Sequence, residues 1–124
     1  MNIICIDNDA AALRRLMQRT RQLVPDATVH GCNDPGEAVS LTDREGCDVL
    51  LTDIDLGRSH IDGFMLAERI QRINPRVNII FLTECDEEKY GVEAYRLHAS
   101  GYLLKPYSSD ALADEFAHLR YKTV

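Results

Sequence analysis

The sequence has 124 residues, which fits a single domain covering 1–124, and the 45% of apolar residues are sufficient for a hydrophobic core. The formal net charge of −6 argues against direct nucleic acid binding by this domain. No apolar stretch approaches the roughly 20 residues of a membrane span, there is no signal peptide, and the cysteines form no C-x-x-C pair, so we expect a reduced, cytoplasmic protein that binds no membrane.

The first part of the chain alternates two strands with two helices. The apolar run at 2–6 predicts a buried strand, and residues 9–24 carry leucines at helical spacing up to the proline that follows them. A short strand is predicted at 27–30. Residues 34–45 are predicted to form a helix because Asp34 provides an N-cap, a proline takes the first helical position and a glycine follows the end.

The second part continues the alternation around a polar loop at 53–62. Its elements, in chain order, are a strand at 49–52, a helix at 63–73, a strand at 78–82, a helix capped by Asp86 and ending near residue 98, a strand at 101–104 and a last helix capped by Ser108. Three of the five strands are continuous apolar runs, as in parallel sheets that helices cover on both faces. The pattern predicts a doubly wound α/β domain with five strands and five helices.

Chemically active side chains follow four of the predicted strands. The first strand is followed by the polar run Asp7-Asn8-Asp9. The third strand is followed by Asp53, the fourth by Thr83 and the fifth by Lys105. Because the carboxyl ends of parallel strands share one edge of the sheet, these side chains should converge there. Carboxylates beside one hydroxyl and one ammonium suit a divalent cation and a phosphoryl group.

These four motifs, in this order and within this pattern of strands and helices, resemble the receiver domain of two-component response regulators. The resemblance covers essentially the whole chain and implies a flavodoxin-like parallel sheet in the order 2-1-3-4-5. The segment 90–106 is especially similar to receivers that precede LytTR-type DNA-binding domains. The resemblance therefore implies a histidine kinase as phosphodonor and an effector or DNA-binding output domain as partner.

The resemblance also implies a role for each polar residue. Asp53 corresponds to the phosphoacceptor, which takes a phosphoryl group from a phosphohistidine. The ligands of Mg²⁺ would be Asp7, Asn8, Asp53 and the backbone carbonyl of Asp55. Lys105 would pair with Asp53 in the empty state and with the phosphoryl oxygens in the charged state.

Three further residues would complete the switch. The Lys105–Pro106 peptide bond is expected to be cis, which would aim the lysine at the site. Thr83 would donate its hydroxyl to a phosphoryl oxygen, and Tyr102 corresponds to the aromatic residue whose ring turns inward when the threonine moves. In this family, the face formed by the fourth helix, fifth strand and fifth helix often contacts the output domain or a second copy of the chain.

Some residues depart from the family pattern. Asn8 replaces the usual second carboxylate, so we expect weaker Mg²⁺ binding, and Asp9 is expected to start the first helix rather than to compensate. The loop between Asp53 and Gly63 is about two residues longer than usual and lacks the usual Met-Pro. The extra negative charges of Asp55 and Glu84 are expected to change the lifetime of a phosphoryl group.

Two other functions stay open. Asn8 and the altered loop are compatible with a pseudo-receiver that signals without phosphorylation. Asp53 and Asp55 form an Asp-x-Asp as in haloacid-dehalogenase-type phosphatases, but those enzymes carry it after the first strand and have a longer chain. We expect a domain that catalyses its own phosphotransfer and hydrolysis and is not a turnover enzyme.

Overall fold

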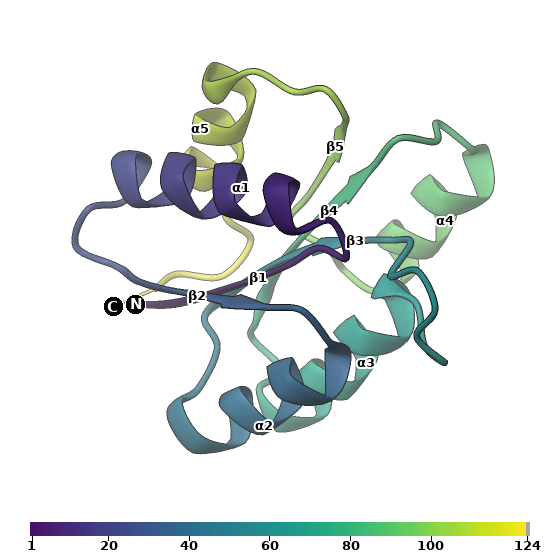
Figure 1. Ribbon diagram of the computed structural model, residues 1–124, viewed down its shortest axis with the longest axis horizontal. Helices are drawn as coiled ribbons and strands as arrows, with labels where there is room; N and C mark the ends of the chain where they lie inside the picture. The colour runs from purple at the N-terminus through teal and green to yellow at the C-terminus, as the bar shows by residue number, and fades with distance from the viewer. Residues whose placement is uncertain (124) are drawn as a thin grey trace.

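Five parallel strands form the central sheet in the order β2-β1-β3-β4-β5, which confirms the expected topology (Figure 1). The computed structural model describes residues 1–123. The strands are β1 (Asn2–Ile6), β2 (Thr28–Cys32), β3 (Val49–Asp53), β4 (Asn78–Thr83) and β5 (Gly101–Leu104). All carboxyl ends of these strands therefore point to the same edge of the sheet.

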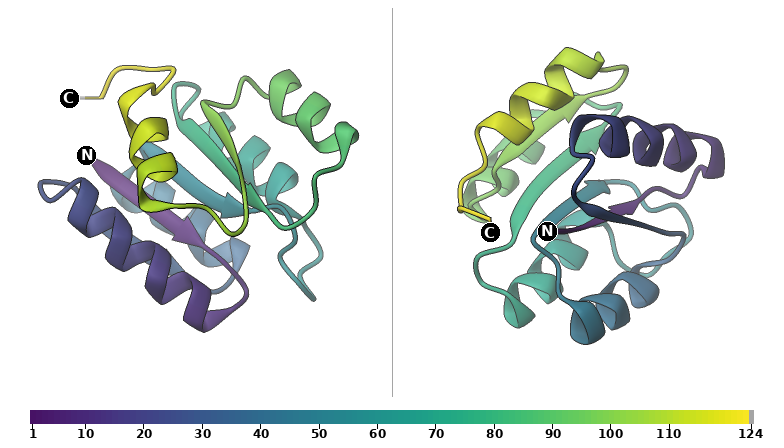
Figure 2. Two further views of the ribbon diagram at one scale, coloured as in Figure 1. Left: turned by 90° about the horizontal axis from the view of Figure 1, so that it is seen from above. Right: turned by 90° about the vertical axis from the view of Figure 1, so that its left-hand side faces the viewer.

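Five helices cover both faces of the sheet. They are α1 (Ala10–Leu23), α2 (Pro35–Glu45), α3 (Gly63–Ile73), α4 (Glu88–Arg96) and α5 (Ser109–Ala117). The right-hand view of Figure 2 shows α1 and α5 on one side and α2 and α3 on the other. Ala94, the buried residue of α4, belongs to the core cluster that lies under α2 and α3. No helix within residues 1–123 is both long and apolar enough to cross a membrane.

The central strands β3 and β4 are buried along their whole length. Neighbouring residues alternate between the two cores: Leu50 lies in the cluster under α2 and α3, whereas Leu51 lies in the cluster under α1 and α5. This two-sided burial explains why these strands are continuous apolar runs instead of alternating ones. Each such side chain contributes about 2 kcal/mol when removed from water, and Asp53 and Thr83 are the last residues of these two buried strands.

Local capping residues define most helix starts as predicted. The side chain of Asp34 accepts a hydrogen bond from the Gly36 backbone at 2.8 Å, and that of Ser108 accepts one from Ala111 at 3.0 Å. Asp9 caps α1 by accepting from the Ala11 backbone at 3.0 Å, which confirms its assignment to the helix start.

The predicted start of α4 and both predicted ends of the second strand are wrong. The N-cap of α4 is Glu87 and makes no side-chain capping bond, so Asp86 does not cap this helix. The reason is the preceding turn, in which the Cys85 backbone donates to the Thr83 hydroxyl and delays the helix. Strand β2 starts one residue later than predicted and extends to Cys32, because it pairs with the full length of β1.

Candidate functional site

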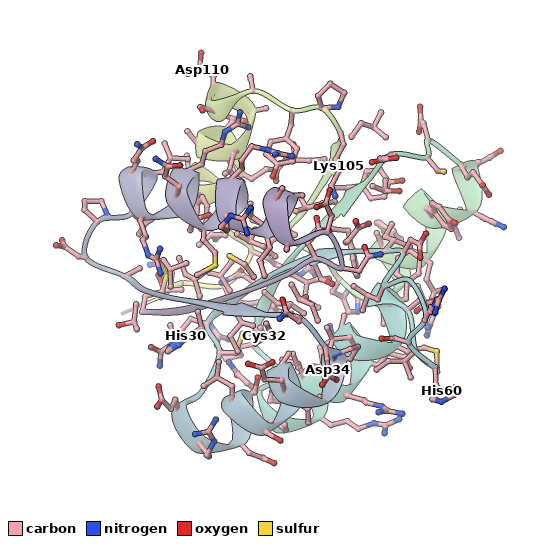
Figure 3. All side chains as sticks on the ribbon, viewed as in Figure 1. His30, Cys32, Asp34, His60, Lys105 and Asp110 are labelled. Atoms are coloured by element: carbon pink, nitrogen blue, oxygen red, sulfur yellow. The ribbon has the colours of Figure 1, made fainter. Side chains whose placement is uncertain are left out.

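The polar residues at the strand ends meet at one edge of the sheet, although they are far apart in sequence. The ammonium group of Lys105 lies 2.8 Å from Asp7 Oδ2 and 2.9 Å from Asp53 Oδ2. Figure 3 shows Lys105 beside the N-terminal end of α1 and the end of β4. The side chains of Asp7, Asp53 and Lys105 are only 3%, 12% and 17% exposed, so little solvent screens this contact.

Local turns fix the second oxygen of each carboxylate. Asp7 Oδ1 accepts a hydrogen bond from the Asp9 backbone at 2.9 Å, and Asp53 Oδ1 accepts one from the Asp55 backbone at 3.2 Å. Each carboxylate is therefore held by its own loop on one side and by Lys105 on the other. This leaves Asp53 oriented toward the edge of the sheet, where an incoming group can reach it.

The electrostatic environment of Asp53 and Lys105 follows from burial and from their contact. Burial raises the pKa of the Asp53 carboxyl above its ordinary value, although the hydrogen bond and charge of Lys105 act in the opposite direction. Burial by itself would lower the pKa of Lys105, but the hydrogen bonds and charges of Asp7 and Asp53 outweigh it, and the pKa is raised. Lys105 therefore stays charged at neutral pH.

The oxygen donors around Asp53 fit a hard cation such as Mg²⁺. Asp7 and Asp53 supply carboxylates, and the Asn8 amide and the Asp55 backbone carbonyl are further oxygen donors in the adjoining loops. Within residues 1–123 there is no group of three or more His, Cys, Asp or Glu placed to hold a metal. The fit therefore depends on the amide and carbonyl oxygens, and the expected weakening of Mg²⁺ binding by Asn8 stays a prediction.

Asn8 and the altered loop lie against each other. A Cβ atom on Gly57 would be 2.7 Å from Asn8 Nδ2, and Gly57 has a left-handed φ of +66° that favours glycine. The Gly57 backbone in turn donates to the side chain of Asp55 at 2.9 Å. The two departures from the family pattern are thus one structural unit, which connects the β1–α1 loop to Asp55, two residues after Asp53.

A prediction follows for the amide at position 8. Asn8→Asp should bind Mg²⁺ about tenfold more tightly, because it adds a carboxylate beside Asp7 and Asp53. Isothermal titration with MgCl₂ measures the change. Gln22→Glu adds the same charge at an exposed position near the end of α1 and should leave the affinity unchanged. Equal affinities for wild type and Asn8→Asp would show that position 8 does not face the cation.

Thr83 and Tyr102 both contact the backbone of Cys85, a residue that the sequence did not single out for this role. The Cys85 N–H donates to Thr83 Oγ1 at 3.1 Å, and the Thr83 hydroxyl is 3.4 Å from the Cys85 carbonyl oxygen. The Tyr102 hydroxyl donates to the same carbonyl at 3.3 Å. The half-buried ring of Tyr102 packs against the core under α2 and α3. Cys85 therefore connects the two residues through main-chain atoms, which residue types alone do not reveal.

A cavity of about 540 Å³ opens beside Asp53. Its wall includes Lys105, Pro106 and Tyr107, together with Arg15 and Arg19 from α1. Of the two acidic residues expected to influence a phosphoryl group, Glu84 lines this cavity, whereas Asp55 uses a carboxylate oxygen in the turn with Gly57. The Lys105–Pro106 peptide bond is cis.

Comparisons with known proteins agree on one family. A family model described as "Response regulator receiver domain" matches residues 3–117. The Positive alginate biosynthesis regulatory protein of Pseudomonas aeruginosa is 32% identical over 115 residues, which cover 92% of this chain and 45% of that protein. The Sensory transduction protein LytR of Streptococcus mutans is 28% identical over 124 residues, which cover 97% and 48%. The chain spans about half the length of these curated relatives.

Solved structures share the fold at lower identity. The chemotaxis protein CheY4 of Vibrio cholerae superposes with a TM-score of 0.82 at 17% identity, covering 94% of this chain and 95% of that one. A DNA-binding response regulator of the LuxR family from Staphylococcus aureus superposes with a TM-score of 0.82 at 16% identity, also covering 94% of this chain and 95% of that one. At these identities the likeness shows the five-stranded α/β fold.

Proposed function

Because this chain belongs to the response regulator receiver domain family, we propose that it is the phosphoacceptor domain of a two-component system and that Asp53 is the acceptor. The observation that carries this proposal is the contact of Lys105 with both Asp7 and Asp53 at the edge of the sheet. A buried carboxylate beside a fixed cation is oriented for attack on phosphorus and has a ready partner for the charge of the product.

In the proposed reaction, a carboxylate oxygen of Asp53 attacks the phosphorus atom of a phosphohistidine on a sensor histidine kinase. The new O–P bond forms as the N–P bond breaks, and the histidine nitrogen leaves with the bonding electron pair. Lys105 moves its hydrogen bond from Asp53 to a phosphoryl oxygen and stays with Asp7. Asp7, Asn8, Asp53 and the Asp55 carbonyl would hold Mg²⁺, which neutralises charge between acceptor and phosphoryl group when bound.

The structural effect of phosphorylation would reach the surface through Thr83, Cys85 and Tyr102. The Thr83 hydroxyl would leave the Cys85 carbonyl for a phosphoryl oxygen, so that this carbonyl is left to Tyr102. Tyr102 also lines a surface hollow with two residues of α4, Val92 and Tyr95, which are 63% and 86% exposed. Phosphorylation of Asp53 would in this way change the conformation of the face formed by α4, β5 and α5.

We assign that face to the output of the signal. Its exposed aromatic and aliphatic side chains suit an interface with an output domain or with a second copy of the chain. The curated relatives are regulatory proteins about twice as long as this chain, which supports a DNA-binding output domain on a longer protein. The 28% identity to a LytR protein supports an output of the LytTR type. We also propose that the domain is cytoplasmic and that it does not turn over an external substrate.

The decisive experiment is the intact mass of the protein after incubation with acetyl phosphate, with and without Mg²⁺. We expect a gain of one phosphoryl group that requires both Mg²⁺ and Asp53, because the carboxylate supplies the only new bond to phosphorus. Asp53→Asn keeps the size of the side chain and should show no gain. No gain in the wild-type chain under any condition would instead favour the pseudo-receiver, and turnover of p-nitrophenyl phosphate would favour a phosphatase.

A further inference from the structure

Arg19 connects helix α1 to the segment that carries Lys105. Its Nη1 donates a hydrogen bond to the backbone carbonyl oxygen of Tyr107 at 3.2 Å. Its guanidinium carbon lies 5.8 Å from the centre of the Tyr107 ring, within reach of a cation–π contact. Tyr107 is two residues beyond Lys105, and all three residues line the cavity beside Asp53.

The Lys105 segment links the last strand to the last helix. At its start, the Lys105 N–H donates to the Thr83 carbonyl at 2.8 Å, which continues the pairing of β5 with β4. At its end, the Ser108 side chain caps α5. Between these two points the chain must place one ammonium group within 2.9 Å of two carboxylates. The bond from Arg19 to Tyr107 holds the backbone in this interval from the side of α1.

We propose that Arg19 is a positioning residue for the phosphotransfer reaction, which fixes the backbone after Lys105 so that the ammonium group bridges Asp7 and Asp53. This inference rests on the proposed function for its role in catalysis, but the contact itself is independent of it. Small displacements matter at such a site, because the rate depends on holding reacting groups in a narrow geometry. Arg19 acts through Lys105 and does not touch Asp53.

Arg15 provides a matched control. It lies one turn earlier on the same helix, carries the same charge and lines the same cavity, but its side chain is exposed. If Arg19 merely contributed positive charge for an anionic phosphodonor, Arg15→Ala and Arg19→Ala would have the same effect. If Arg19 positions the Lys105 segment, only Arg19→Ala should lower the maximal rate, whereas the loss of charge at Arg15 should change the half-saturating concentration of the phosphodonor.

The test compares wild type, Arg19→Ala, Arg19→Lys and Arg15→Ala with acetyl phosphate as donor. We expect Arg19→Ala to lower the maximal phosphorylation rate about tenfold, because the ammonium group would be held less precisely between Asp7 and Asp53, with little change in the half-saturating concentration of acetyl phosphate. Arg19→Lys keeps a cationic donor on α1 and should recover part of the rate. Arg15→Ala should keep the maximal rate, and the loss of its charge beside the cavity should appear only as a higher half-saturating concentration of acetyl phosphate.

Amide hydrogen exchange gives a readout that does not require phosphorylation. Exchange at the Lys105 amide, which donates to the Thr83 carbonyl, should accelerate in Arg19→Ala relative to Arg15→Ala, while the β3 and β4 amides keep their protection. Equal exchange in the two variants, or a loss of rate that appears only as a higher half-saturating concentration, would overturn the proposal. Failure of the wild-type chain to accept a phosphoryl group would refute the proposed function, and the exchange comparison would still decide the positioning role.

Discussion

Replacing Gly63 with alanine is expected to lower the free energy of unfolding by about 3 kcal/mol, the upper part of the range for overpacking a buried site. A Cβ atom at Gly63 would lie 2.2 Å from the Asp53 carbonyl oxygen and 2.9 Å from Ile54 Cα. Both are backbone atoms at the end of β3, which its two neighbours in the sheet hold in place, so rotation of a side chain cannot relieve the overlap. Alanine would otherwise favour the helix that begins here.

Urea unfolding followed by circular dichroism measures this loss. Gly91→Ala is the matched control, because Gly91 lies within α4 and a Cβ atom there would meet nothing within 4 Å. That variant should be more stable than wild type by about 0.5 to 1 kcal/mol, since glycine inside a helix is unfavourable. If Gly63→Ala were as stable as wild type, the close approach of α3 to β3 would be incorrect, and with it the packing that holds Asp53.

Lys105→Met should destabilise the domain by about 2 kcal/mol near neutral pH, less than for a fully buried pair because the site borders an open cavity. The substitution keeps the apolar stem of the side chain but leaves Asp7 and Asp53 close together without a cation. The two influences of Lys105 that lower the pKa of Asp53 disappear, so this pKa should rise further above its ordinary value of 3.8. Ionisation of Asp53 then raises the free energy of the folded state relative to the unfolded state.

The pH dependence distinguishes this effect from a loss of packing. A carboxyl whose pKa is raised on folding destabilises the folded state progressively as the pH rises above its unfolded value. Lys105, whose pKa is raised, contributes its full stabilisation below its ordinary value of 10.5 and loses it only above. The difference between wild type and Lys105→Met should therefore be small near about pH 4 and large near about pH 8.

Urea unfolding at these two pH values tests the prediction. Lys89→Met serves as the control, because Lys89 pairs with Glu87 at the exposed start of α4 and its loss should leave the stability nearly unchanged. A loss in Lys105→Met that is equal at both pH values would indicate a packing defect instead of uncompensated carboxylates. The same variant should also retain a phosphoryl group less well than the wild type, since Lys105 is the proposed cationic partner of the product.

The candidate site was largely predictable from sequence because its residues occupy strand ends. Asp53, Thr83 and Lys105 each follow an apolar run, and parallel strands must bring such positions to one edge. The start of α4 was not predictable in this way. Asp86 has the chemistry of an N-cap, but the hydrogen bond between Thr83 and Cys85 shapes the turn before it. A capping residue is effective only where the preceding backbone presents it to the helix.

The sequence alone determined the alternation of strands and helices, the two-sided burial of the central strands and the identity of the polar residues at their ends, because these properties depend on hydrophobic periodicity and on local capping. Only the tertiary structure decided which atoms meet. The bridge from Lys105 to two carboxylates, the packing of Asn8 on Gly57 and the bond from Arg19 to Tyr107 join distant segments through specific distances and main-chain atoms. Residue types and spacing do not encode such contacts individually, since they arise from how the whole sheet and its helices pack.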